Sequence, residues 1–195
     1  MMEAPASHEE EFNDWYDHEH FPQRRALPGF LSASRWVCLD GWPRWLALYD
    51  LDSMEALRSD AYLAVSGANS TPWSKRILPR TIGRSRIVAQ AASASCDTPL
   101  APTGVSRLLL MRHTAVVPGL AAAQALQEQL SAQLNAMPQL LQTRMFHETH
   151  AQRTDVWSIS LFGSPVFAQE LAAAVGQAGG VGASVFNLYS PYKRA

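Results

Sequence analysis

The feature that most constrains the fold of this chain is an internal repeat with an offset of 110 residues. The sequence ALPGFL at residues 26–31 returns as AMPQLL at residues 136–141. An apolar run with a tryptophan follows each copy, WLALYDL from Trp45 and VWSISLF from Val156. Each copy continues with a helix-like stretch and closes with a short apolar run. Repetition at a fixed period predicts two copies of one structural unit.

The second copy predicts six elements in a regular order. Its apolar runs and its helical spacing indicate, in chain order, a strand from Arg107, a helix that Pro118 opens and Pro138 ends, strands over residues 140–148 and 156–162, a helix over residues 165–175 and a strand over residues 184–189. This order is βαββαβ, which is typical of a ferredoxin-like unit.

The first copy predicts only αββαβ. Its helix runs from about His8 to Phe21 and begins at a capping box, with Ser7 as the N-cap and Glu10 three residues later. Its last strand is RIVAQ at residues 86–90.

The offset places the counterpart of the first strand before the start of the sequence, so we expect this strand to be missing. The alternative is a short, poor strand over residues 1–6, where Pro5 is unfavourable. We predict one unit over residues 1–90, a linker rich in Ala, Ser, Pro and Thr over residues 91–104, and a second unit over residues 105–195.

The composition excludes several classes of protein. The chain has 47% hydrophobic and 17% charged residues and a net charge of −1, without a stretch dense in Lys or Arg. Nucleic acid and membrane are therefore not expected as partners. The two cysteines, Cys38 and Cys96, lie far apart, which does not favour a disulfide scaffold or a structural zinc site. With no basic leader and no long apolar run, we expect a cytoplasmic protein.

The stretch FNDWYDHEHFPQR, residues 12–24, carries the best candidates for chemistry. On an α-helix, Tyr16 and His20 are neighbours at i and i+4, and Asp17 lies one turn before His20. A neutral imidazole oriented by Asp17 or Tyr16 is suited to act as a general base near neutral pH. The alternative is that His20 is a helix-end residue bound to a loop carbonyl.

Metal and cofactor sites have less support. His18 and His20 lie about 200° apart on a helix, so they cannot share one ion. Glu148 and His150 give at most two convergent ligands. We therefore expect neither metal nor cofactor.

The opening helix and the turn after it resemble the EthD-like proteins of the dimeric α/β-barrel superfamily. The local match covers about 25 residues, and beyond it the resemblance is one of architecture through the repeat. The matching residues are Phe12, Trp15, Tyr16, His20, Pro22, Pro28, Gly29 and Phe30.

The resemblance implies an α+β fold of two tandem ferredoxin-like units, paired through their sheets as an internal or intersubunit barrel, with a homodimer as one open arrangement. Its relatives catalyse different reactions, so the fold does not choose one. Some of them bind haem through a histidine, which leaves haem held by His113, His147 or His150 as a less favoured alternative to surface or hydrogen-bonded histidines. We expect a small-molecule enzyme or binder acting on an apolar carbonyl or phenolic compound by cofactor-free proton transfer. Its catalytic residues would be His20, Asp17 and Tyr16, and its ligand-binding residues Trp15, Phe12, Trp36 and Trp73.

The competing hypothesis is a non-catalytic ligand-binding or structural protein. It predicts a barrel interior filled by Trp15, Trp36 and Trp45, with His20 in solvent. The enzyme hypothesis instead predicts an open cavity of about 300 Å³ or more that contains the His20 ring.

Overall fold

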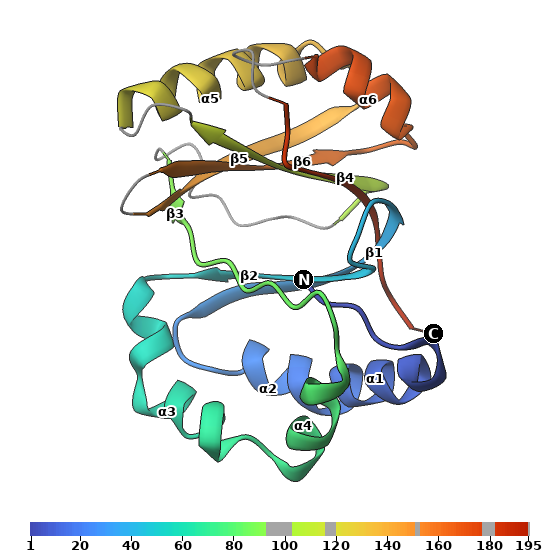
Figure 1. Ribbon diagram of the computed structural model, residues 1–195, viewed down its shortest axis with the longest axis vertical. Coiled ribbons are helices and arrows are strands. Elements are labelled where there is room, and N and C mark those ends of the chain that lie inside the picture. Colours follow the sequence, from blue (N-terminus) through green and yellow to red (C-terminus); the bar gives the residue numbers. More distant parts are fainter. Residues whose placement is uncertain (93–102, 116–119, 151–152, 177–181, 195) are drawn as a thin grey trace. The chain divides into compact units, whose positions relative to one another are not determined.

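A computed structural model describes residues 1–92, 103–115, 120–150, 153–176 and 182–194 (Figure 1). The chain divides into two compact units. The first holds Met1–Trp36 and Pro43–Ser85, and the second holds Val37–Trp42 and Arg86–Ala195. Much of the predicted linker lies outside the described residues. Each unit is described by itself below.

The second unit follows the βαββαβ order that its sequence predicts. Along the chain come β4 (Arg107–Ala115), α5 (Leu120–Asn135), β5 (Leu140–Thr149), β6 (Thr154–Phe162), α6 (Ala168–Val175) and β7 (Val185–Pro191). These strands hydrogen-bond in the order β7-β4-β6-β5, and β4 pairs with both neighbours in antiparallel register. Both helices lie over one face of this sheet (Figure 1).

The core of the second unit lies between those helices and the sheet. From α5, Leu130 and Leu134 are fully buried, and from β4, Leu109 and Met111 meet them. Leu171 of α6 completes the cluster. The α5 residues are at helical spacing, and alternate residues of β4 point toward the helices, while Leu108 and Leu110 are buried on the opposite face of the strand. Burying a leucine side chain stabilises a fold by about 1.5–3 kcal/mol.

Two strands extend this sheet at its edges. The end of β1 (Phe30–Asp40) neighbours β7. The short strand β3 (Gln90–Ala91) pairs with β5, Gln90 opposite His147. The prediction that residues 86–90 close the first unit as a strand is therefore wrong, since only Gln90 of this run lies in a strand and it pairs within the second unit.

The first unit consists of a long helical segment, two neighbouring strands and several short helices. Its elements are α1 (Glu9–Trp15), a π-helical segment (Tyr16–His20), α2 (Phe21–Arg25), most of β1, β2 (Trp45–Leu51), a 3₁₀ turn (Met54–Arg58), α3 (Asp60–Leu63) and α4 (Pro72–Ile77). α1 packs against α4. Ser59 and Thr71 cap α3 and α4, because each side chain accepts a backbone N–H of the first turn.

The start of the chain partly replaces the strand that the repeat predicts to be missing. Met2 forms an antiparallel bridge with Trp45 at the start of β2, and Glu3 forms one with Ile82. Four backbone hydrogen bonds of 2.9–3.0 Å hold these two residues. The segment thus provides two single bridges in place of a full strand. This outcome is closer to the alternative of a short, poor strand, and Pro5 ends it because proline lacks an N–H donor.

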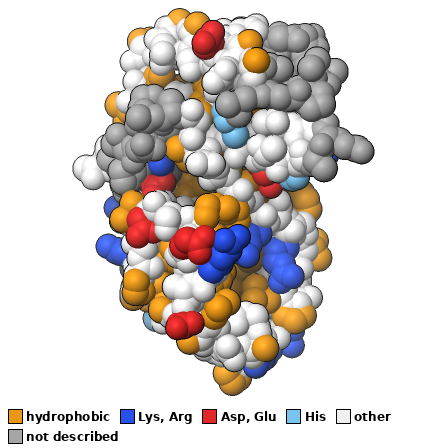
Figure 2. All heavy atoms as spheres, turned by 90° about the vertical axis from the view of Figure 1, so that its left-hand side faces the viewer, with side chains coloured by type: hydrophobic (Ala, Val, Ile, Leu, Met, Phe, Trp, Pro, Cys, Tyr) orange, Lys and Arg blue, Asp and Glu red, His pale blue; other side chains and the backbone are white. Residues whose placement is uncertain are grey.

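The surface carries charges of both signs. Figure 2 shows acidic and basic side chains interspersed on one face, with apolar side chains exposed between them. Among the described residues, none of the helices has the length and apolarity needed to cross a membrane. Cys38 forms no disulfide within the described part of the chain, and Cys96 lies outside that part.

Candidate functional site

The helix that carries the candidate site is longer than predicted and changes its pitch midway. Helical structure continues from Glu9 to Arg25 through the π-helical segment, in which the Phe21 N–H bonds to the Tyr16 carbonyl five residues back. Proline within a helix lacks a donor and crowds the carbonyl four residues earlier, and a widened turn before Pro22 relieves this crowding. The prediction that the helix ends at Phe21 is wrong for this reason.

The predicted capping box is also absent. Ser7 lies in a 3₁₀ turn, its hydroxyl contacts His8 Nδ1 at 2.9 Å, and no side chain caps α1. Three consecutive glutamates in the first turn favour the helix start instead, through the helix dipole.

The π-helical segment brings His20 onto Trp15. On a regular α-helix, residues five apart differ by roughly 140° around the axis and face apart. Here the two ring centroids lie 4.6 Å apart with planes 33° apart, and Tyr16 meets the His20 ring edge-on at 5.1 Å. His20 is therefore half-buried in an aromatic corner.

Asp17 does not orient His20, contrary to prediction. Its Oδ1 accepts a hydrogen bond from Arg35, a buried residue of β1. Arg35 also donates to Asn13 Oδ1 at 2.8 Å, and its guanidinium lies 4.2 Å from the centre of the Tyr16 ring. The widened helix turns Asp17 toward the strand because α-helical spacing no longer holds between residues 17 and 20.

His20 is neutral at physiological pH in this environment. Burial, followed by the charges of Arg24 and Arg35, lowers its pKa from 6.5 to about 3. Its Nδ1 is buried and has no hydrogen-bond partner among the described residues. His20 Nδ1 lies near two guanidinium groups. It can accept a hydrogen bond from a ligand hydroxyl or, in the other tautomer, donate one to a ligand oxygen.

Two further polar atoms of the first unit, Asp17 Oδ2 and Arg24 Nη1, are buried without a hydrogen-bond partner in the described part of the chain. Burial raises the pKa of Tyr16, and it raises that of Tyr49 well above the ordinary value. The two hydroxyls also interact with each other, which lowers the pKa of Tyr16 and raises that of Tyr49. Buried polar atoms without a partner are rare in native interiors, because each costs about 1–3 kcal/mol, and they indicate a ligand or water.

We call Trp15, Tyr16, His20, Arg24, Arg35 and Tyr49 the His20 group. All six residues belong to the first unit. Sequence reasoning misses Tyr49, since one tyrosine in an apolar strand gives no signal. For Arg24 and Arg35 it favours structural pairing with nearby carboxylates over pairing with a substrate carboxylate.

A polar network fixes the outer side of this group. Glu19 Oε1 accepts hydrogen bonds from Trp15 Nε1 at 3.1 Å, from Ser74 Oγ at 3.1 Å and from Thr71 Oγ1 at 2.5 Å. This carboxylate joins the helix to the start of α4 and holds the Trp15 indole in one orientation. The plane on which His20 stacks is therefore rigid.

The other predicted wall residues lie at different places. Phe12 is buried and contacts Trp15 and Tyr16, 5.8 and 5.5 Å between centroids. Trp36 follows Arg35 on β1, so its side chain points to the opposite face, where its indole donates to Ser34 Oγ at 2.8 Å. Trp73 lies on α4, where it interacts with Glu11. Neither Trp36 nor Trp73 belongs to the His20 group.

The structural hypothesis for the interior meets its expectation only in part. Trp15, Trp36 and Trp45 are all buried at 5% exposure or less, as the structural hypothesis predicts. His20 is half-buried and faces aromatic rings, which differs from the solvent position that this hypothesis requires.

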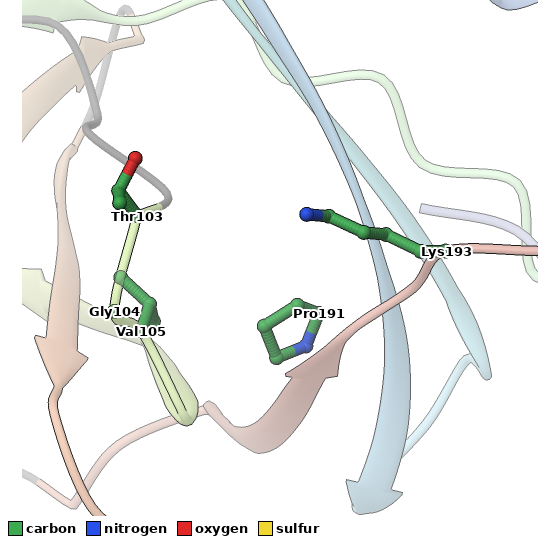
Figure 3. Close-up of a pocket in the computed structure, with 5 residues that line it drawn as sticks. All are labelled: Thr103, Gly104, Val105, Pro191 and Lys193. Carbon is green, nitrogen blue, oxygen red and sulfur yellow. The ribbon is translucent and has the colours of Figure 1, made fainter.

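A cavity of about 440 Å³ occurs elsewhere, in the second unit (Figure 3). Thr103, Gly104, Val105, Pro191 and Lys193 line it, and the Lys193 side chain points across it toward Thr103 (Figure 3). None of the predicted site residues lines this cavity.

Two histidines of the second unit are also perturbed. His113 on β4 is 1% exposed, and burial lowers its pKa. Burial likewise lowers the pKa of His147 on β5. Each has one ring nitrogen that is buried without a hydrogen-bond partner among the described residues.

Comparison with known proteins supports the fold. The crystal structure of an anthrone oxidase-like protein matches 98% of this chain and 88% of that chain, with a TM-score of 0.63 and 14% sequence identity. No family model matches the sequence, and no curated protein does. The match shows an α+β fold with an antiparallel sheet, as predicted. The EthD-like assignment and the tandem ferredoxin-like repeat stay predictions.

Proposed function

We propose that this protein binds a small, largely apolar molecule with a carbonyl or phenolic oxygen at the His20 group, and that it catalyses cofactor-free proton transfer there. The observation that carries this proposal is a pair of buried nitrogens, His20 Nδ1 and Arg24 Nη1, that have no hydrogen-bond partner among the described residues. A ligand oxygen among them would satisfy donors that the fold leaves unpaired.

The charges of the group favour an oxygen anion. Arg24 and Arg35 depress the pKa of His20, and the same positive potential stabilises an enolate or a phenolate. Trp15 and Tyr16 offer flat apolar surface to the carbon skeleton of such a ligand.

His20 alone is a weak base, and the bound anion would correct this. A pKa 3.5 units below the ordinary value of 6.5 makes protonation harder by roughly 5 kcal/mol. An anion about 4 Å from the imidazolium returns about 4 kcal/mol at an effective dielectric constant of ~20. The two terms are of similar size, so attraction within the ion pair that forms when a carbon or hydroxyl acid passes its proton to His20 offsets most of the low basicity of the ring.

Anthrone is a suitable first probe. It is a flat tricyclic ketone with an acidic CH₂ group, and the structural neighbour is described as an anthrone oxidase-like protein. Loss of one proton from this CH₂ to a nitrogen of His20 leaves the electron pair delocalised onto the carbonyl oxygen. That oxygen would lie toward Arg24 and Arg35.

The test measures anthrone binding and the rate of its deprotonation by absorbance, in the wild type and in His20→Phe. We expect His20→Phe to lower the rate by roughly 10²–10⁴-fold, the range of general base catalysis. His18→Gln changes an exposed histidine of the same helical segment and should leave the rate unaltered. An unchanged rate in His20→Phe would refute the catalytic role.

A non-catalytic ligand-binding or structural protein is the second candidate. The near-complete burial of Trp15, Trp36 and Trp45 favours it, because large rings then fill interior space. It predicts no rate enhancement with anthrone or with naphthols, and no loss of ligand binding in His20→Phe.

A further inference from the structure

A second cluster of polar side chains lies in the second unit, far along the sequence from the His20 group. Glu148 near the end of β5 stands directly opposite Asp155 on β6. His150 follows Glu148 by two residues, so the alternation of extended backbone points both side chains to the same face. The fold thus adds Asp155 to the pair Glu148 and His150, which by itself is insufficient for a metal.

The distances within this cluster suit a small cation. One ligand atom from each of the three residues lies within 4.8 Å of the others. His150 Nε2 is 3.5 Å from Asp155 Oδ2 and 3.7 Å from Glu148 Oε2. Ligands at about 2.0–2.1 Å from a tetrahedral ion are separated by roughly 3.3–3.4 Å. The two measured separations come within a few tenths of an ångström of this distance between ligands.

Asp155 provides independent evidence for a ligand. Its side chain has 0% exposure, and Thr114 Oγ1 donates to its Oδ1 at 2.7 Å. Its Oδ2 has no hydrogen-bond partner among the described residues and points at His150. A buried carboxylate oxygen without a donor is unfavourable unless a cation compensates it.

The nearest cation in the protein compensates this oxygen poorly. Arg153 Nε lies 3.4 Å from Asp155 Oδ2 without hydrogen-bonding geometry, and the arginine side chain is 52% exposed. It can move into solvent at small cost. Outer contacts already hold the carboxylates, since Trp157 Nε1 donates to Glu148 Oε2 at 2.9 Å and Thr114 orients Asp155. Partners of this kind orient the ligands of metal sites.

We propose that Glu148, His150 and Asp155 bind one zinc ion. One imidazole and two carboxylates form a donor set that suits zinc, whereas calcium and magnesium prefer oxygen ligands alone. Three protein ligands leave a fourth position of the tetrahedron for water or another small ligand. This proposal stands independently of the function proposed for the His20 group.

The test is zinc binding by the full chain, prepared without a histidine tag, in competition with a chromophoric chelator. We expect one zinc ion per chain and, with cobalt in its place, the intense visible absorption of a tetrahedral site. His150→Ala should weaken zinc binding by more than roughly 100-fold, since it removes a ligand. Thr114→Val should weaken it by roughly 10–100-fold, since it removes only an orienting contact.

Arg153→Gln is the sharpest control, because the proposal predicts that this variant binds zinc more tightly, whereas His150→Ala and Thr114→Val bind it more weakly. Removing this competing cation should tighten zinc binding by roughly tenfold. His18→Gln, an exposed histidine in the first unit, should have no effect. Because His150 is exposed, His150→Ala is expected to fold, and far-UV circular dichroism checks this. The ligand variant at the buried position, Asp155→Asn, is therefore not needed for the test.

Three outcomes would overturn the proposal. They are the absence of zinc binding at 100-fold excess of metal, equal binding in the wild type and in His150→Ala, and full displacement of zinc by equimolar magnesium.

Discussion

The depressed pKa of His20 has a measurable consequence for stability in acid. In the folded protein His20 binds a proton only near pH 3, while in the unfolded chain it does so near pH 6.5. Between these values the unfolded state binds more protons, so acidification favours unfolding. The contribution of neutral His20 to the free energy of unfolding is fully present above about pH 6.5. It is lost progressively as the pH falls toward 3.

The size of this loss follows from the two pKa values. Each pH unit inside the window costs about 1.36 kcal/mol. Between pH 7 and pH 5, His20 alone should therefore reduce the free energy of unfolding by about 2 kcal/mol, and between pH 7 and pH 3 by roughly 4 kcal/mol. Partial exposure of the ring makes these values upper estimates.

The assay is urea unfolding at pH 7 and pH 5, followed by tryptophan fluorescence, for the wild type and for His20→Phe. Phenylalanine keeps an aromatic ring against Trp15 but does not titrate. We expect the wild type to lose about 2 kcal/mol more than His20→Phe over this interval. Contributions of His113 and His147 are common to both proteins and cancel in the difference. Equal losses in the two proteins would refute the reasoning, and His18→Gln, which should behave as the wild type, is the matched control.

Three other predictions concern the same structure. Arg35→Met should destabilise the first unit by roughly 3 kcal/mol, because it leaves Asp17 without its ion-pair partner, and adding Asp17→Asn should restore part of this in urea unfolding. Pro22→Ala should return the π-helical segment toward α-helix and move the pKa of His20 up toward 6.5, as measured by NMR; an unmoved pKa would contradict the role assigned to proline. Leu130→Ala should cost about 2–5 kcal/mol since its side chain is fully buried, whereas the same change at Leu141, 57% exposed, should cost less than about 0.5 kcal/mol, and equal costs would contradict the described core.

The elements of the second unit were predictable because their apolar residues follow a single period. Leu130 and Leu134 repeat at helical spacing, and β4 is a continuous apolar run bounded by a turn. Such signals depend only on which face is buried. The bounds of these strands and helices accordingly agree with prediction to within a few residues.

The geometry around His20 was not predictable in the same way. The helical wheel assumes constant pitch, and the π-helical segment before Pro22 breaks that assumption. It moves Asp17 onto Arg35 and places His20 on Trp15, a pairing that α-helical spacing excludes. A proline shortly after a charged, aromatic helix is the available signal, and the same signal is typical of a helix end.

The zinc cluster shows a different limit. Glu148 and Asp155 are seven residues apart in sequence, and only the hairpin register places them opposite each other. Register depends on the turn between the strands, which sequence periodicity does not determine.

The measurement that tests the central proposal most directly is an NMR titration of the His20 ring, with and without 1-naphthol as an oxygen-bearing aromatic probe. We predict that the probe raises the pKa of His20 above about 3, because its hydroxyl oxygen accepts a hydrogen bond from the protonated ring and so favours the charged form. A His20 ring whose signals and pKa are unchanged at saturating probe would contradict the proposal that this group is the binding site.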